Sequence, residues 1–228
     1  MVHLCPGMFL PRAGSLIIMR LAFGARNAFR EGVRDAGSVT SDPSMLTQAE
    51  RIALLDATLH ELPPTVDGGR VQVGGEEAVL LWEATVDSFA GGVWVATILC
   101  AQATCERVLA GLVLLRELPG YGIEAPKRWQ TWGLGTLIGH VREQGWVPTD
   151  LLDAVQVLCE ARKPYGHFRR PFYKGTIGRQ VADALVEEGW DADPMAVRQR
   201  ILSEEALRST RTTLRLYFGD YARGPFEG

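Results

Sequence analysis

Apolar residues recur every three or four positions through most of the chain after residue 46, the spacing of helices that bury one face. No run shows the sustained apolar–polar alternation that predicts strands. We therefore predict an all-α fold. The predicted helices cover residues 47–62, 76–90, 93–118, 134–144, 149–162, 176–188, 194–202 and 204–222.

Local signals support several of these boundaries. Thr47 and Glu50 have the spacing of a capping box, in which each side chain bonds the other residue's backbone N–H. Pro63-Pro64 is expected to end that first helix. Thr149 is predicted to cap the helix over 149–162, and Asp193, followed by a proline, is predicted to cap the helix after it.

The domain organisation follows from the same pattern. Residues 1–45 are rich in Gly, Ser and Pro at both ends and are predicted to be an N-terminal extension. Residues 46–228 are predicted to form a single antiparallel helical bundle with peripheral N- and C-terminal helices. The strongest pattern lies in 93–118, where a seam for packing against another helix consists of Ile98, Ala101, Cys105, Val108, Leu112 and Leu115.

Composition narrows the function classes. The net charge is −3, from 24 Lys and Arg against 27 Asp and Glu, which argues against a general nucleic-acid coat protein. No apolar run reaches the ~18 residues of a membrane span, and we expect a cytoplasmic protein without a membrane segment. His60 and His140 are expected at the surface. Reduced, buried thiols without a metal motif are predicted for Cys5, Cys100, Cys105 and Cys159.

One basic window contrasts with this acidic balance. Residues 161–182 contain one histidine, no acid and six basic residues: Arg162, Lys163, Arg169, Arg170, Lys174 and Arg179. A site for a polyanion is therefore expected to be local and to lie here.

Arg162 and His167 are the candidates for chemistry within that window. Arg162 follows Leu158 by four residues, so it extends the inward apolar stripe of its helix. On an unbroken helix a five-residue separation places two side chains about 140° apart. Pro164 disfavours helix continuation, and we expect a break there that aims both side chains at one point.

Five further residues are candidates for the same site. Glu106, on the long helix, is predicted to orient the catalytic pair, the alternative being an exposed carboxylate. Lys163, Arg169 and Arg170 are candidates for steering RNA, the alternative being a solvated basic turn. Tyr165 is a candidate for stacking on a base, the alternative being a place in the core.

This pattern resembles the HEPN superfamily of helical-bundle proteins, which carry Arg-x(4–6)-His near the end of a core helix. The match here is Arg162, four residues, then His167, and it follows a long helix, a Trp-bearing loop and a short helix. The resemblance covers residues 76–190. It implies a metal-independent endoribonuclease without a cofactor, in which Arg162 holds the phosphate while His167 moves protons.

The resemblance also implies a homodimer that acts on RNA, as a toxin or defence effector with a restraining protein partner. Two departures leave an alternative open. Lys163 and Pro164 stand where many members have Asn or another small polar residue, and Arg169 stands where a tyrosine is frequent. The alternative is a catalytically inactive HEPN-like helical module that binds RNA or a protein partner.

Overall fold

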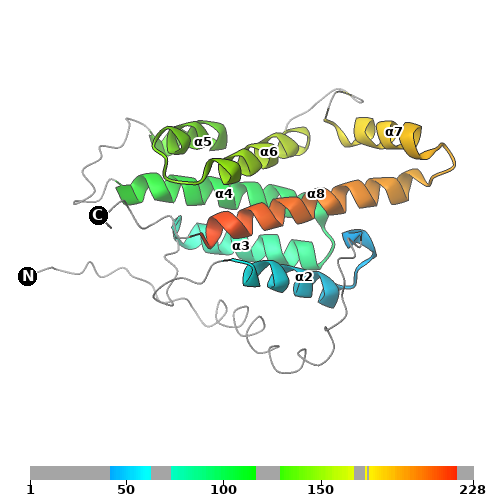
Figure 1. Cartoon of the computed structure of the whole chain (residues 1–228), viewed down its shortest axis with the longest axis horizontal. Coiled ribbons are helices and arrows are strands. Elements are labelled where there is room, and N and C mark those ends of the chain that lie inside the picture. The colour runs from blue at the N-terminus through cyan, green and yellow to red at the C-terminus, as the bar shows by residue number, and fades with distance from the viewer. Residues whose placement is uncertain (1–41, 63–72, 117–128, 167–172, 174, 220–228) are drawn as a thin grey trace, which may run out of the picture. The chain divides into compact units, whose positions relative to one another are not determined.

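The computed structural model describes residues 42–62, 73–116, 129–166, 173 and 175–219, all within the compact unit Ser41–Gly228. Every regular element in this described part is helical, which confirms the all-α prediction. The elements, shown in Figure 1, are η1 (Pro43–Met45), α2 (Gln48–His60), α3 (Gly75–Ala90), α4 (Trp94–Arg116), η2 (Trp129–Thr131), α5 (Leu134–Glu143), α6 (Thr149–Gly166), α7 (Ile177–Glu188) and α8 (Pro194–Tyr217).

Helix α4 is the centre of this unit. It packs against α3, α5, α6 and α8, and α8 also contacts α6 and α7 (Figure 1). The predicted seam of α4 is confirmed, because all of its residues are buried except Leu115, which is half-buried. By length and composition α4 is the one helix of the described residues that could cross a membrane, and half of that apolar window is buried against its neighbours.

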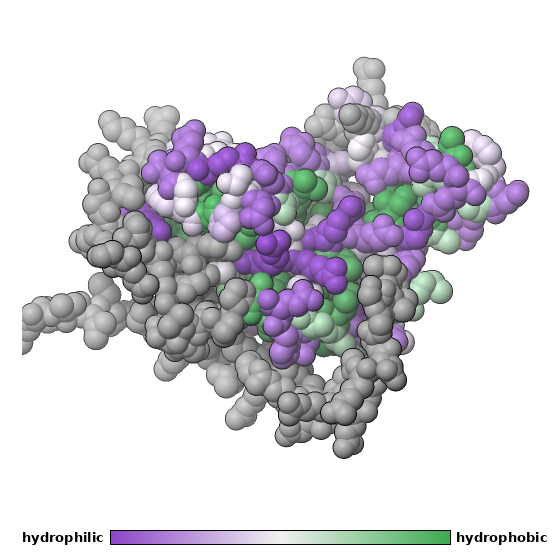
Figure 2. Space-filling view, viewed as in Figure 1, coloured by the Kyte–Doolittle hydropathy of each residue, from purple (hydrophilic) through white to green (hydrophobic). Residues whose placement is uncertain are grey.

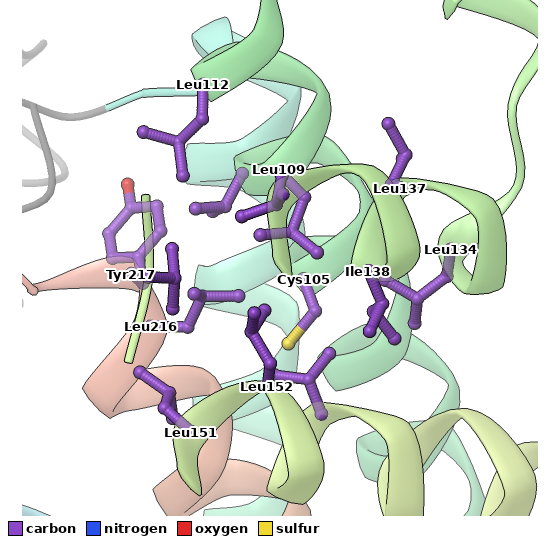
Figure 3. Packing of buried hydrophobic residues seen from close by; sticks show 14 of the residues in the cluster. Cys105, Leu109, Leu112, Leu134, Leu137, Ile138, Leu151, Leu152, Leu216 and Tyr217 are labelled. Carbon is purple, nitrogen blue, oxygen red and sulfur yellow. The ribbon is translucent and has the colours of Figure 1, made fainter. Parts of the chain in front are cut away.

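The larger apolar cluster joins five helices, α3, α4, α5, α6 and α8. In Figure 3, Cys105 and Leu109 of α4 face Ile138 of α5 and Leu152 of α6. Leu216 of α8 (Figure 3) and Trp82 of α3 belong to the same cluster. The apolar residues that recur at helical spacing in α5 are all buried: Leu134, Leu137, Ile138 and Val141.

Two predicted helix starts are confirmed and one is corrected. The Thr47 capping box is present, with the Thr47 backbone N–H 2.7 Å from Glu50 Oε2. Asp193 caps α8 by accepting from the Met195 N–H at 2.9 Å. Thr149 is not a cap but the first residue of α6, because Leu152 N donates to the carbonyl of Pro148.

The C-terminal part of the chain differs from the prediction of two helices. Residues 194–217 form the single helix α8. Ser203, at the predicted gap, is buried, and its Oγ lies 2.9 Å from both Arg200 O and Asp42 Oδ1. Its hydroxyl is thus satisfied without ending the helix. The prediction of a peripheral C-terminal helix is also wrong, because Leu214 and Leu216 lie in the main cluster.

Two glycines allow the chain to enter α3 close to α4. Gly74 precedes α3 with φ 101°, in the left-handed region that favours glycine. A Cβ added to Gly111 of α4 would lie 2.3 Å from the Gly74 backbone nitrogen. The two backbones approach this closely only because Gly111 has no side chain.

Candidate functional site at the end of helix α6

Helix α6 continues through Pro164 to Gly166. The predicted break at Pro164 is therefore wrong. Because Pro164 lies in the last turn, it removes only one intrahelical hydrogen bond, the one to the carbonyl of Glu160. The turn is also held by tertiary packing, since Tyr165 lies against an apolar cluster that α8 shares.

Arg162 lies one turn after the buried Leu158, as its spacing predicts, and is half-buried. Its Nε is fully buried and has no hydrogen-bond partner in the described part of the chain. The guanidinium lies along the last turn, so that a Cβ added to Gly166 would be 3.1 Å from Nε. Gly166 thus leaves room for the side chain, whose buried N–H has no acceptor among the residues that the structure describes.

Glu106 lies on α4, which packs against α6. The buried Gln102 donates to Glu106 Oε2 at 3.1 Å, which holds the carboxylate in place. Arg162 and Glu106 both act electrostatically on the thiol of Cys159, which lies on α6 where this helix packs against α4. Burial, and then the charge of Glu160, raise the pKa of Cys159.

Tyr165 is tied to α8. Its hydroxyl donates to Glu205 Oε2 at 3.3 Å, and its ring packs with the cluster that contains Leu202 and Ala206. Burial raises the pKa of Glu205, against the opposing effects of the Arg208 charge and the Tyr165 hydrogen bond. Burial, and then the Glu205 charge, raise the pKa of Tyr165.

Sequence reasoning missed Glu205, although a signal for it exists. Glu205 follows Leu202 by three residues and precedes Ser209 by four, so a continuous helix places it on the inward face. The predicted helix boundary between residues 202 and 204 concealed this register. Ser209 is buried together with Glu205, which extends the polar character of this part of α8.

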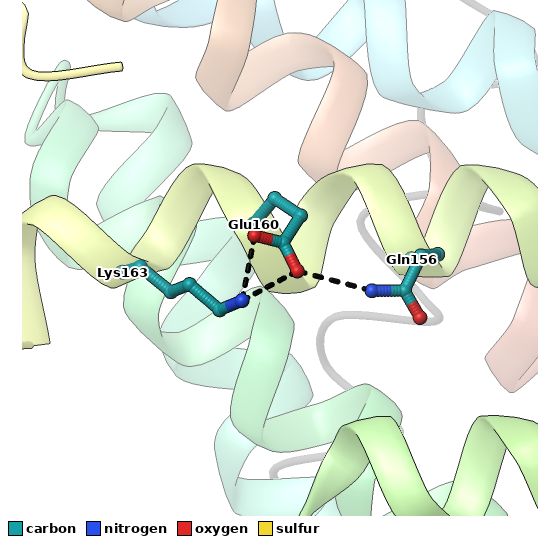
Figure 4. A network of polar contacts seen from close by, with 3 residues as sticks. All are labelled: Gln156, Glu160 and Lys163. Carbon is teal, nitrogen blue, oxygen red and sulfur yellow. Dashed lines mark hydrogen bonds and ion pairs between the residues drawn. The ribbon is translucent and has the colours of Figure 1, made fainter. Parts of the chain in front are cut away.

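Lys163 points along the exposed surface of α6. Its Nζ lies 2.6 Å from both carboxylate oxygens of Glu160, and Gln156 donates to the same carboxylate from the preceding turn (Figure 4). Because Lys163 is one residue beyond Arg162, the two side chains leave the helix about 100° apart. The structure does not bring Lys163 to the buried Nε.

The remaining site candidates, His167, Arg169 and Arg170, lie outside the described residues. The convergence of His167 with Arg162 therefore stays a prediction. Among the residues that the structure does describe, no group of three His, Cys, Asp or Glu side chains is placed to hold a metal ion.

The other histidines and the cysteines have defined surroundings. His60 is exposed and pairs with Asp56. The surface prediction for His140 is wrong, because its Nε2 is buried and its ring contacts Trp132 and Trp146 edge-on, with centroids 5.2 and 5.4 Å away. The prediction of buried thiols is confirmed for Cys105, where burial raises the pKa to about 12, but Cys100 and Cys159 are only half-buried. Cys5 lies outside the described residues.

Comparison with known proteins gives no relative. No family model, no curated protein and no solved structure matches this chain.

Proposed function

We propose that the chain is a metal-independent endoribonuclease of the HEPN type, acting on an RNA phosphodiester through Arg162 and His167. The observation that supports it is the buried Nε of Arg162, which has no acceptor within the described residues. Leaving a buried donor unpaired costs about 1–3 kcal/mol, so such a group points to a ligand that supplies the acceptor.

A phosphate group is the acceptor that suits this donor. A guanidinium carries five N–H groups in a planar fork that fits phosphate oxygens and stays charged at all relevant pH values. In its present position the Arg162 guanidinium lies beside Gly166, the last residue of α6 and the one before His167. In the sequence, Arg162, which is proposed to bind the phosphate, and His167, which is proposed to carry the proton, therefore lie on either side of the end of α6.

The proposed reaction needs no metal or cofactor. His167 takes the proton from a ribose 2′-hydroxyl as its oxygen forms a bond to the adjacent phosphorus, and the bond from phosphorus to the 5′-oxygen breaks. That leaving oxygen accepts a proton from a second, protonated His167, supplied by the other copy in a homodimer. Arg162 stabilises the charge that develops on the phosphoryl oxygens, and Glu106 orients the pair.

The biological setting within this proposal is a toxin or defence effector that a protein partner restrains. Such a setting suits an enzyme whose reaction needs only its own side chains, because nothing but a partner then limits its activity.

A second candidate function is an inactive HEPN-like module that binds RNA or a protein. Three observations favour it. Lys163 is engaged by Glu160, the Tyr165 ring is packed against the core, and Pro164 lies within the helix instead of breaking it. Fewer groups are then free to position a substrate than the sequence predicts.

The test uses purified full-length protein and a mixed RNA substrate in excess EDTA. We expect chelator-resistant cleavage that leaves cyclic 2′,3′-phosphate ends, and we expect His167→Ala to lower the rate at least about a hundredfold, the usual scale for removing a general acid–base group. Gel analysis of end-labelled RNA measures the rate.

His60→Ala is the matched control, because His60 is exposed on α2 and its removal should leave the rate unchanged. Cleavage that survives His167→Ala would assign the activity to another group or to a contaminant. RNA that is bound by both proteins but cut by neither would contradict the nuclease and support the binding module.

A further inference from the structure

The corner between α7 and α8 exposes large apolar side chains. Val186, Trp190 and Met195 are 65%, 75% and 54% exposed, although they lie within ten residues of one another. Scattered apolar residues are normal at a protein surface, whereas a group around an open tryptophan is typical of a contact site. Figure 2 shows apolar surface among polar residues in the region of α7.

Acidic residues lie between these apolar residues in the sequence. Residues 186–195 contain Glu187, Glu188, Asp191 and Asp193 and no Lys or Arg. Glu188 pairs with Arg200, and Asp193 accepts from the first turn of α8. Glu187 and Asp191 are exposed, and neither forms an ion pair with any described residue.

Backbone hydrogen bonds hold this corner at the end of α7 and in the turn that follows. Gly189, with φ 105°, ends α7, and its N–H donates to Leu185 O at 3.1 Å. Ala192 N then donates to Gly189 O at 3.3 Å, which turns the chain toward α8. Leu185 and Val197 are buried on either side of the turn. The exposed apolar groups are therefore held on a fixed frame.

We propose that this α7–α8 corner, residues 186–195, is a docking site for a basic amphipathic segment of another protein. Trp190 is the apolar anchor, and Glu187 and Asp191 are the groups that meet the cations of the partner. Tryptophan is the residue type most often found to dominate binding energy at protein interfaces, and complementary charge around it selects the partner.

The negative charge of the corner argues against a second copy of the chain, RNA or an anionic membrane as its partner. A two-fold contact of the corner with a second copy would face acids with acids, since the same patch lies on both sides of such an interface. RNA and the anionic surface of a membrane carry the same sign as the corner and would be repelled. The proposal is independent of the proposed ribonuclease, because none of its residues belongs to the site at the end of α6.

The experiment measures binding of a fluorescent synthetic helix with leucine at helical spacing, flanked by lysine and arginine. The comparison peptide has glutamate at every basic position. We expect fluorescence anisotropy to show binding of the basic peptide alone, weaker at higher salt. We expect Trp190→Ala to weaken it at least about tenfold, or 1.4 kcal/mol. We expect Glu187→Gln with Asp191→Asn to reduce the salt dependence.

Val157→Ala is the matched control, because Val157 is 65% exposed on α6, outside the corner. Circular dichroism confirms that each variant is folded. The proposal is overturned if the basic peptide does not bind, if the acidic peptide binds equally well, or if Trp190→Ala and Val157→Ala behave alike.

Discussion

The two halves of α6 continue one inward stripe but bury different chemistry. The first three turns place Leu151, Leu152 and Val155 in the main apolar cluster. The last turn, near α4 and α8 (Figure 1), carries the half-buried Arg162 and Tyr165, and the Tyr165 hydroxyl donates to Glu205 of α8.

This difference separates the residues that stabilise the fold from the residues that are candidates for function. Each fully buried leucine or valine of the first half contributes about 1.5–3 kcal/mol by leaving water. The second half gains less, because the Arg162 Nε–H buried there has no partner among the described residues, and the Tyr165 hydroxyl meets the buried carboxylate of Glu205 on α8. Groups that lower stability in this way are concentrated at functional sites, where natural proteins depart from the rules of a well-packed core.

The largest expected effect lies in the apolar half. Leu152→Ala should lower the free energy of unfolding by about 2–5 kcal/mol, because Leu152 is completely buried among α4, α5 and α8. Urea unfolding measures the change. Val157→Ala, an exposed position on the same helix, should stay within about 0.5 kcal/mol of the wild type. Equal losses in both variants would contradict the burial described here.

A smaller effect, with a defined pH dependence, is expected at Glu205. Burial raises its pKa above the ordinary 4.5, so the folded protein keeps a proton that the unfolded chain releases. The stability linked to this proton is fully present below pH 4.5 and is lost as the pH rises through the raised pKa. Glu205→Gln should therefore be more stable than the wild type at pH 7, and its stability should depend less on pH above pH 4.5.

Thermal unfolding from pH 4 to 8 tests this expectation at Glu205. Glutamine keeps an oxygen that can accept from the Tyr165 hydroxyl, so the variant changes the charge and little else. Glu204→Gln, at the exposed neighbouring position, is the control. Parallel profiles for Glu205→Gln and the wild type would show that the buried carboxylate carries no penalty.

The smallest stability effect is expected at Arg162. Arg162→Met keeps a long side chain and removes the unpaired donor, so the free energy of unfolding should stay within about 1 kcal/mol of the wild type. RNA cleavage, or RNA binding if the protein is not a nuclease, should be lost. Unfolding in urea and the RNA assay, run on one preparation, give both values.

Arg142→Met is the control for Arg162→Met. Arg142 forms an exposed ion pair with Asp153, which lies in the first half of α6. Its loss should change neither the free energy of unfolding nor the cleavage or binding of RNA. A loss of several kcal/mol in Arg162→Met, comparable to that of Leu152→Ala, would place Arg162 among the residues that hold the fold.

Much of the fold follows from the sequence, because helical periodicity and caps are local signals. The Thr47 capping box and the buried seam of α4 are both read from residues a few positions apart. The helix ends predicted at Pro164 and at Ser203 are wrong for the same reason. Each residue is a weak helix former by itself, and packing of its helix against a distant one decides the outcome.

The candidate site is less predictable than the fold. The inward position of Arg162 follows from its spacing to Leu158, but the lack of a partner for its Nε within the described part of the chain depends on the surrounding helices. Glu205 and Tyr165 are 40 residues apart in the chain, and only the packing of α6 on α8 brings them together. The surface position predicted for His140 is wrong because the two tryptophans that contact its ring lie outside α5, Trp132 before it and Trp146 after it.

The central position of α4 has a consequence during synthesis on the ribosome. Its apolar seam is completed by α8, which begins at Pro194, long after Arg116 at the end of α4 has been made. A nascent chain that has emerged only as far as α5 therefore exposes a 23-residue apolar helix while its partners α6 and α8 are still missing. Until α8 has been made, the apolar seam of α4 is incompletely covered, and exposed apolar surface of this kind favours association with other chains.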